Sequence, residues 1–181
     1  MRWWPLAVAV IITVPMSGCL APVVLEEDFS RGLGEWEVGM DLPIDPDTGR
    51  PVNAWVNLAH DRYRSADVSV EMTIDGWQDD GTVWIMRRLE GQWDRLQVSF
   101  HLFSTGASNN VLAHPVAYIG EEMPTREDQF TTLGNANRGE GWLSFKMDGP
   151  GGQDPWVAVG ITVAWETWLS YHLDDVRVRG S

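Results

Sequence analysis

Tryptophan is the residue type whose number in this chain points most directly to chemistry. The chain of 181 residues contains eleven tryptophans, and only Trp3 and Trp4 lie in its first segment. Each indole side chain covers about 150–250 Å² and carries an N–H that needs a partner when it is buried. A small domain can bury only some of these rings, so we expect several of them near the surface.

Some of these tryptophans stand beside charged residues in predicted turns. Trp77 precedes two aspartates, and Trp165 and Trp168 lie between the last two predicted strands. An exposed indole ring can stack on a sugar ring while carboxylate and guanidinium groups bind the sugar hydroxyls. The predicted ligand surface comprises Trp77, Asp79, Asp80, Trp84, Arg87, Trp165, Glu166 and Trp168. The same rings would also suit a protein interface, and any one of them could instead pack in the core.

Two glutamates, Glu71 and Glu166, are the candidates for a catalytic pair. A retaining glycosidase needs two carboxyl groups about 5–5.5 Å apart. Glu71, however, falls on the polar face of an alternating strand, and Glu166 falls in a turn. The sequence also lacks a Gly-x-Ser-x-Gly motif, a phosphate-binding loop and closely spaced histidines. It therefore predicts no catalytic site.

The only cysteine, Cys19, follows a short apolar run from Leu6 to Val14. That run is much shorter than the roughly 20 residues that a membrane-spanning helix needs, so it predicts a leader that is removed. The segment Met16-Ser17-Gly18-Cys19 resembles the lipobox of prokaryotic lipoprotein signals. The resemblance implies a signal peptide over residues 1–18 and a lipidated tether over residues 19–25. An ordinary secretory leader is the alternative.

The charge balance restricts the partners of the chain. It has 13 basic and 26 acidic residues, which gives a formal net charge of −13. Nucleic acids and anionic membrane surfaces attract basic patches, so neither is the expected partner. A hydrophobic content of 44% is sufficient for a core, and a single cysteine excludes a disulfide framework.

The elements that must position these residues are short strands. Alternation of apolar and polar residues predicts about ten of them, separated by turns at 45–49, 79–81 and 149–152. One short helix is expected at 124–130, with Thr125 as its cap and Asp128 at the reciprocal position. Because no crossover helices separate the strands, the fold class is an all-β antiparallel sandwich or barrel. The predicted strands are 23–29, 36–38, 52–59, 68–74, 82–88, 96–102, 111–119, 142–147, 156–163 and 168–178.

Both ends of the mature chain carry a family resemblance. The segments Glu27-Asp28-Phe29-Ser30, Gly34-Glu35-Trp36 and 171–178 resemble the jelly-roll β-sandwich of carbohydrate-binding modules and galactose-binding-like domains. The resemblance implies one such domain over residues 26–181. It also implies a structural Ca²⁺ between the first and last strands, with Asp28 and Asp175 as ligands. The alternative is that these carboxylates simply end their strands in solvent.

The sequence thus favours a monomeric, membrane-anchored extracytoplasmic lipoprotein, attached through lipid on Cys19. Its mature domain is expected to be a non-catalytic binding domain whose ligand is a carbohydrate. Fold alone does not fix function, so two alternatives stay open. One is an envelope protein that interacts with another protein, and the other is a glycan-active hydrolase or lyase.

Overall fold

The structure is a computed structural model that describes residues 22–74, 81–104, 113–163 and 169–181. Strands dominate this part of the chain, and the only helical element in it is one 3-10 turn, η1 (Glu127–Gln129). The strands are β1 (Val23–Glu27), β2 (Glu37–Asp41), β3 (Ala54–Ala59), β4 (Ser69–Ile74), β5 (Thr82–Arg88), β6 (Gln92–Ser104), β7 (Ala113–Gly120), β8 (Thr131–Thr132), β9 (Gly141–Gln153), β10 (Trp156–Val163) and β11 (Leu169–Gly180).

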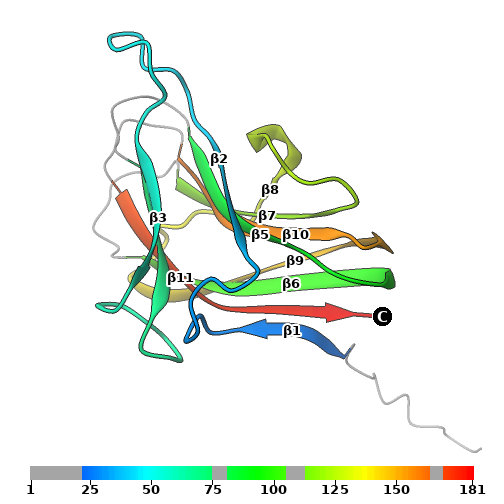
Figure 1. The fold of residues 1–181 in the computed structure, drawn as a ribbon. Coiled ribbons are helices and arrows are strands. Elements are labelled where there is room, and N and C mark those ends of the chain that lie inside the picture. The colour runs from blue at the N-terminus through cyan, green and yellow to red at the C-terminus, as the bar shows by residue number, and fades with distance from the viewer. Residues whose placement is uncertain (1–21, 75–80, 105–112, 164–168) are drawn as a thin grey trace, which may run out of the picture.

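The strands form two antiparallel sheets. One has the order β3-β4-β11-β6-β9, with β1 also paired to β11, and the other has the order β2-β5-β10-β7-β8. Figure 1 shows the first and last strands side by side, because β1 pairs with the C-terminal half of β11. The expected all-β jelly-roll sandwich is therefore confirmed, and each of the ten predicted strands has a counterpart.

The core lies between the sheets and is made by alternate residues of the strands. Val70 and Met72 of β4, Phe100 of β6 and Leu173 of β11 point into it and are completely buried. The opposite sheet contributes Val83, Ile85, Val159 and Ile161, which are also fully buried. The apolar residues that alternate along the strands of both sheets thus form one hydrophobic core.

The predicted turn at 149–152 is wrong, because this segment belongs to β9 and pairs with β6. A Cβ on Gly151 would stand 1.8 Å from the carbonyl oxygen of Trp93, so the glycine allows a close approach of the two strands. Pro150 is tolerated because β9 is an edge strand, where a missing N–H leaves no partner unpaired. Residues typical of turns therefore allow two paired strands to approach each other closely here.

The predicted helix at 124–130 shrinks to the single turn η1. Arg126, and not Thr125, occupies the position before it. The side-chain oxygen of Gln129 accepts hydrogen bonds from the backbone N–H groups of Thr125 and Arg126, at 2.7 and 2.9 Å. Gln129 therefore takes the reciprocal role that the sequence assigned to Asp128.

The first strand begins where the sequence predicts it. β1 begins at Val23, as the predicted strand 23–29 does, so residues 23–25 of the predicted tether also belong to the sheet. Residues 1–18 and Cys19 lie outside the described part of the chain. Within the described residues, no helix is long and apolar enough to cross a membrane.

Candidate functional site

The outward face of the five-stranded sheet carries an aromatic layer. Trp84 and Met86 of β5 and Ala158 of β10 form a second buried cluster, separate from the core. Tyr118, Phe130 and Trp156 pack against this cluster and are partly buried. The outward face of a sandwich sheet is ordinarily polar, so an aromatic layer in that position indicates either a covering segment or a ligand.

A segment of the chain itself covers part of this layer. We call residues 121–130, between β7 and β8, the strap. The Phe130 ring lies 4.8 Å from that of Trp84 and 5.9 Å from that of Tyr118, measured between centroids. Glu127 fixes the strap to the sheet, because its N–H donates to Asp41 at 2.8 Å and its carboxylate accepts from the Thr162 hydroxyl at 2.9 Å. The strap thus covers part of the aromatic layer with Phe130 and is hydrogen-bonded to β2 and β10 through Glu127.

Charged residues border the other part of the layer. We call Glu37, Arg88, Tyr118 and Trp156 the Trp156 patch. In the register of the sheet, Arg88 pairs with Trp156. The neighbouring row across the four strands consists of Glu37, Met86, Ala158 and Tyr118. Arg88 is held by Asp154, at 3.1 Å to its carbonyl oxygen and 3.5 Å to its carboxylate. Burial and the nearby Glu122 carboxylate raise the pKa of the Tyr118 hydroxyl, which therefore stays protonated. Two partly exposed rings and two charged groups meet at this edge.

The structure corrects the expectation for Trp84. Its side chain is only 1% exposed, because it lies beneath Phe130 and over Gly39 of β2. Its N–H points to the sulfur of Met86 at 3.4 Å. The predicted parity of β5 is confirmed, but the Trp84 ring is not offered to a ligand at the surface.

Arg87 also lies apart from the segment with which it was grouped. It is paired with Glu35 near the end of β5. In the sequence, Trp77, Asp79 and Asp80 precede the first residue of β5, whereas Arg87 is the last but one residue of that strand. Those three residues, and Trp165, Glu166 and Trp168, lie outside the described residues and stay predictions.

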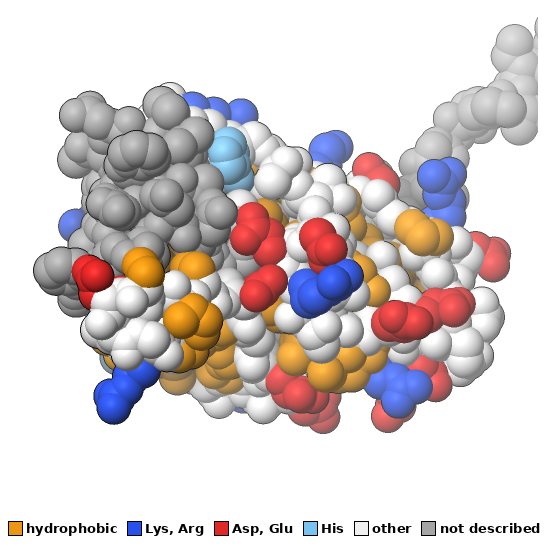
Figure 2. Space-filling model, turned by 90° about the horizontal axis from the view of Figure 1, so that it is seen from above, with side chains coloured by type: hydrophobic (Ala, Val, Ile, Leu, Met, Phe, Trp, Pro, Cys, Tyr) orange, Lys and Arg blue, Asp and Glu red, His pale blue; other side chains and the backbone are white. Residues whose placement is uncertain are grey.

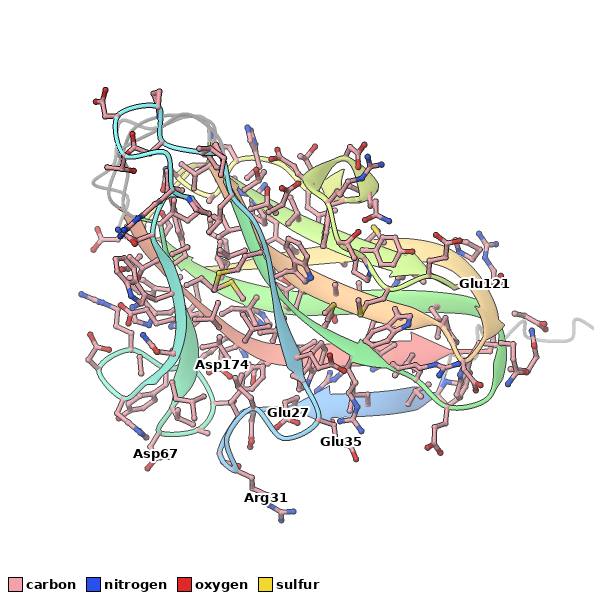
Figure 3. The ribbon with its side chains drawn as sticks, turned by 45° about the horizontal axis from the view of Figure 1, so that its top comes forward. Glu27, Arg31, Glu35, Asp67, Glu121 and Asp174 are labelled. Carbon is pink, nitrogen blue, oxygen red and sulfur yellow. The ribbon has the colours of Figure 1, made fainter. Side chains whose placement is uncertain are left out.

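Asp28 and Asp175, the predicted calcium ligands, line one pocket of about 580 Å³. The pocket lies beyond the end of β1 and also includes Glu27 and Glu35, which Figure 3 shows near the turn that leads to β2. In the same view, Arg31 extends away from the body of the domain. Both carboxylates therefore line the same pocket.

Each of these carboxylates nevertheless has a partner of its own. Asp28 accepts from the N–H and the hydroxyl of Ser30, at 3.0 and 2.6 Å, and these bonds lower its pKa. Asp175 is paired with the guanidinium group of Arg64. Among the described residues, no three His, Cys, Asp or Glu side chains lie close enough together to hold a metal ion. As arranged, these side chains do not form the oxygen shell that Ca²⁺ requires, and calcium binding stays a prediction.

Glu71, the other candidate for catalysis, lies on the outward face of the six-stranded sheet. It is opposite His172 of β11 and Asn57 of β3. Burial is the main cause that lowers the pKa of His172, whose Nδ1 lies 3.2 Å from the Ser69 hydroxyl. Its proposed partner Glu166 lies outside the described residues, so the pair has no geometry here.

Reasoning from the sequence does not single out Tyr118, Phe130, Trp156 or Arg64 as site residues. Trp156 enters it only as one of the tryptophans and as the first residue of a predicted strand. A signal was available for Tyr118 and Trp156, because strand parity sets each on the face opposite its aliphatic neighbours. No local signal marks Phe130 or Arg64, because both act on residues far away in the sequence.

Comparisons with known proteins identify the fold. No protein-family model matches the chain, and a search of curated proteins finds no match. Among solved structures, the chain is similar to a xylan-binding module of Paenibacillus barcinonensis, with 10% identity, 89% of this chain and 96% of that chain covered, and a TM-score of 0.53. A cleaved adhesin domain of Lys-gingipain from Porphyromonas gingivalis gives 18% identity, 87% and 98% coverage, and a TM-score of 0.57.

A third neighbour is part of a larger enzyme. An arabinose-bound α-L-arabinofuranosidase, MgGH51, is 11% identical, with a TM-score of 0.58. The match covers 91% of this chain but only 27% of the enzyme. At these identities the similarity establishes the β-sandwich fold that the chain shares with carbohydrate-binding modules.

Proposed function

We propose that this chain is a non-catalytic glycan-binding domain, and that the Trp156 patch is where the glycan binds. The observation that carries the proposal is the aromatic layer on the outward face of the five-stranded sheet, where Trp156 and Tyr118 are partly exposed. A sugar ring can stack on an indole face, and Arg88 and Glu37 supply a donor and an acceptor for hydroxyl groups. A neighbour in fold that binds xylan adds support.

The test is a titration of the purified protein with soluble xylan and mannan, followed by tryptophan fluorescence and calorimetry. We expect a saturable signal with one glycan class, and a loss of affinity of at least about tenfold in Trp156→Ala. Trp55→Ala is the matched control, since Trp55 is 40% exposed on the edge strand of the other sheet. Loss in Trp165→Ala but not in Trp156→Ala would move the site to the loops predicted from the sequence.

A second candidate is an interaction with another envelope protein. It is favoured by exposed apolar side chains on and after edge strand β2, where Val38, Met40 and Ile44 are 40, 38 and 58% exposed. An edge strand with apolar side chains is suited to a protein partner. No signal with any glycan, in a protein shown to be folded, would reject glycan binding and favour this candidate.

We further propose that the domain is held at the extracytoplasmic face of a membrane by lipid on Cys19. Several acyl chains on one residue give stable attachment, since each buried CH₂ contributes about 0.8 kcal/mol. Cys19→Ala should release the protein from the membrane fraction. Mass spectrometry of the wild-type N-terminus should find a lipidated cysteine, and an unmodified N-terminus elsewhere would support an ordinary secretory leader.

A further inference from the structure

The junction between β4 and β1 along β11 is the place where the six-stranded sheet is interrupted. β4 pairs with residues 169–173 of β11, and β1 pairs with residues 176–179. Asp174 and Asp175 lie between these two pairings. The register of β11 against β6 also shifts there, and Asp175 has a φ of 52°. A left-handed conformation is unfavourable for a residue with a Cβ, so other contacts must hold this bulge in place.

The loop that precedes β4 fills the interruption. The backbone N–H groups of Arg64 and Ser65 donate to Oδ2 of Asp174, at 2.8 and 3.3 Å. The N–H of Asp175 donates to Oδ1 at 2.7 Å. Asp174 is completely buried, and these three donors satisfy it within the protein. The loop is thereby tied to the last strand through its backbone.

The side chain of Arg64 extends this contact to the neighbouring carboxylate. Its guanidinium group pairs with Asp175, whose side chain is 21% exposed. Oδ2 of Asp175 also lies 3.7 Å from Nδ1 of His101. Two other arginines near this junction have partners of their own, because Arg177 pairs with Glu26 and Arg87 pairs with Glu35, and Arg31 extends away from the domain. Among the described residues, the ion pair of Asp175 with a permanently charged group is therefore the one with Arg64.

We propose that the Arg64 guanidinium is the resident cation of this junction and neutralises the carboxylate that a structural calcium ion would otherwise need to neutralise. We call Arg64, Asp174 and Asp175 the Arg64 clamp. A guanidinium group is always protonated and covalently part of the chain, so the clamp neither dissociates nor depends on the calcium concentration. It joins the β3–β4 loop to the bulge of β11 without a metal, beside the pocket at the end of β1. The clamp is independent of any ligand on the other sheet.

The first test uses the unaltered protein. Thermal unfolding is followed by circular dichroism in millimolar calcium, in the same concentration of magnesium, and in excess chelator. We expect the same Tm in calcium and in magnesium, since both screen the net charge of −13 equally. A Tm that is higher in calcium than in magnesium and falls with chelator would overturn the proposal, because it would show a specific calcium site.

The second test uses three variants. Arg64→Met keeps the length of the side chain and removes the charge, and we expect its Tm to fall by about 2–6 °C. Arg64→Lys should recover part of that loss. Arg31→Met is the matched control, because Arg31 lines the same pocket but extends away from it. An unchanged Tm in Arg64→Met, or an equal loss in Arg31→Met, would overturn the role of the clamp.

Discussion

At the residue scale, the position of Trp84 depends on a glycine in the neighbouring strand. A Cβ on Gly39 would stand 2.2 Å from the indole nitrogen of Trp84, and Phe130 blocks movement of the ring outward. Gly39→Ala should therefore lower the free energy of unfolding by about 1–3 kcal/mol. Urea denaturation measures the change, with Gly139→Ala as control because nothing lies within 4 Å of its added methyl group. Equal stability of the two variants would show that Trp84 is not packed over β2.

The two adjacent aspartates of β11 should differ strongly in their contribution to stability. Asp174→Ala leaves three partly buried N–H donors without their acceptor, which should cost about 3 kcal/mol. Asp175→Ala removes one partly exposed ion pair and should cost only about 1 kcal/mol. Urea denaturation of the two variants compares them directly. The reverse order would mean that the ion pair, and not the buried carboxylate, fixes the loop.

Individual residues could be predicted only as far as local periodicity reaches. The alternation in β5 correctly set Trp84 on the face opposite Val83 and Ile85. It could not show that Phe130 covers that face, because the covering residue comes from a distant segment. The resemblance placed Asp28 and Asp175 near each other, and they line one pocket. It did not indicate Arg64, the partner of Asp175, because Arg64 lies in a loop far away in the sequence.

At the element scale, the strap is held by few contacts and should be sensitive to the loss of one ring. Phe130→Ala removes the ring that covers Trp84 and should lower the free energy of unfolding by about 1–3 kcal/mol. It should also make the tryptophan emission more accessible to acrylamide. Tyr118→Phe, which removes only the hydrogen bond from the hydroxyl to the Glu122 carbonyl, should cost about 1 kcal/mol or less. Unchanged quenching in Phe130→Ala would mean that the strap does not shield Trp84.

Most strands and turns were predictable, because alternation of apolar and polar residues indicates strands, and glycine, proline and aspartate indicate turns. The turn at Asp45 is confirmed: its carboxylate accepts from the N–H of Asp47 and the hydroxyl of Thr48. The same residue types wrongly predicted a turn at 149–152, since glycine and proline also occur where an edge strand approaches its neighbour closely. Only the pairing partner distinguishes these two uses, and a single sequence does not contain it.

At the scale of the whole molecule, charge opposes compactness at neutral pH. The net charge is −13, and acidic and basic side chains are interspersed on the face that Figure 2 shows, without a basic patch there. Self-repulsion of this size destabilises a folded chain, and acidification weakens it as carboxylates take up protons. A pH titration at low salt would therefore mix this general effect with the effects of individual buried groups.

Two histidines of the six-stranded sheet act in the opposite direction. Burial is the main cause that lowers the pKa of both His101 and His172 below the ordinary value of 6.5. In the folded protein the neutral ring is favoured, so the unfolded chain binds more protons once the pH falls below about 6.5. Their contribution to stability is therefore present above that pH and is lost as the pH falls toward their lowered pKa values.

High salt separates the two effects, because about 1 M salt shortens the screening length to about 3 Å and suppresses long-range repulsion. Under that condition the free energy of unfolding should fall between about pH 7.5 and about pH 5.5. His172→Gln should reduce this fall, since glutamine does not titrate but can still reach the Ser69 hydroxyl. His101→Gln should reduce it independently, because neither histidine is among the groups that shift the pKa of the other. Burial raises the pKa of Asp174, which opposes this fall equally in the wild type and in both variants. The same pH dependence in the wild type and in both variants would therefore contradict the lowered histidine pKa values.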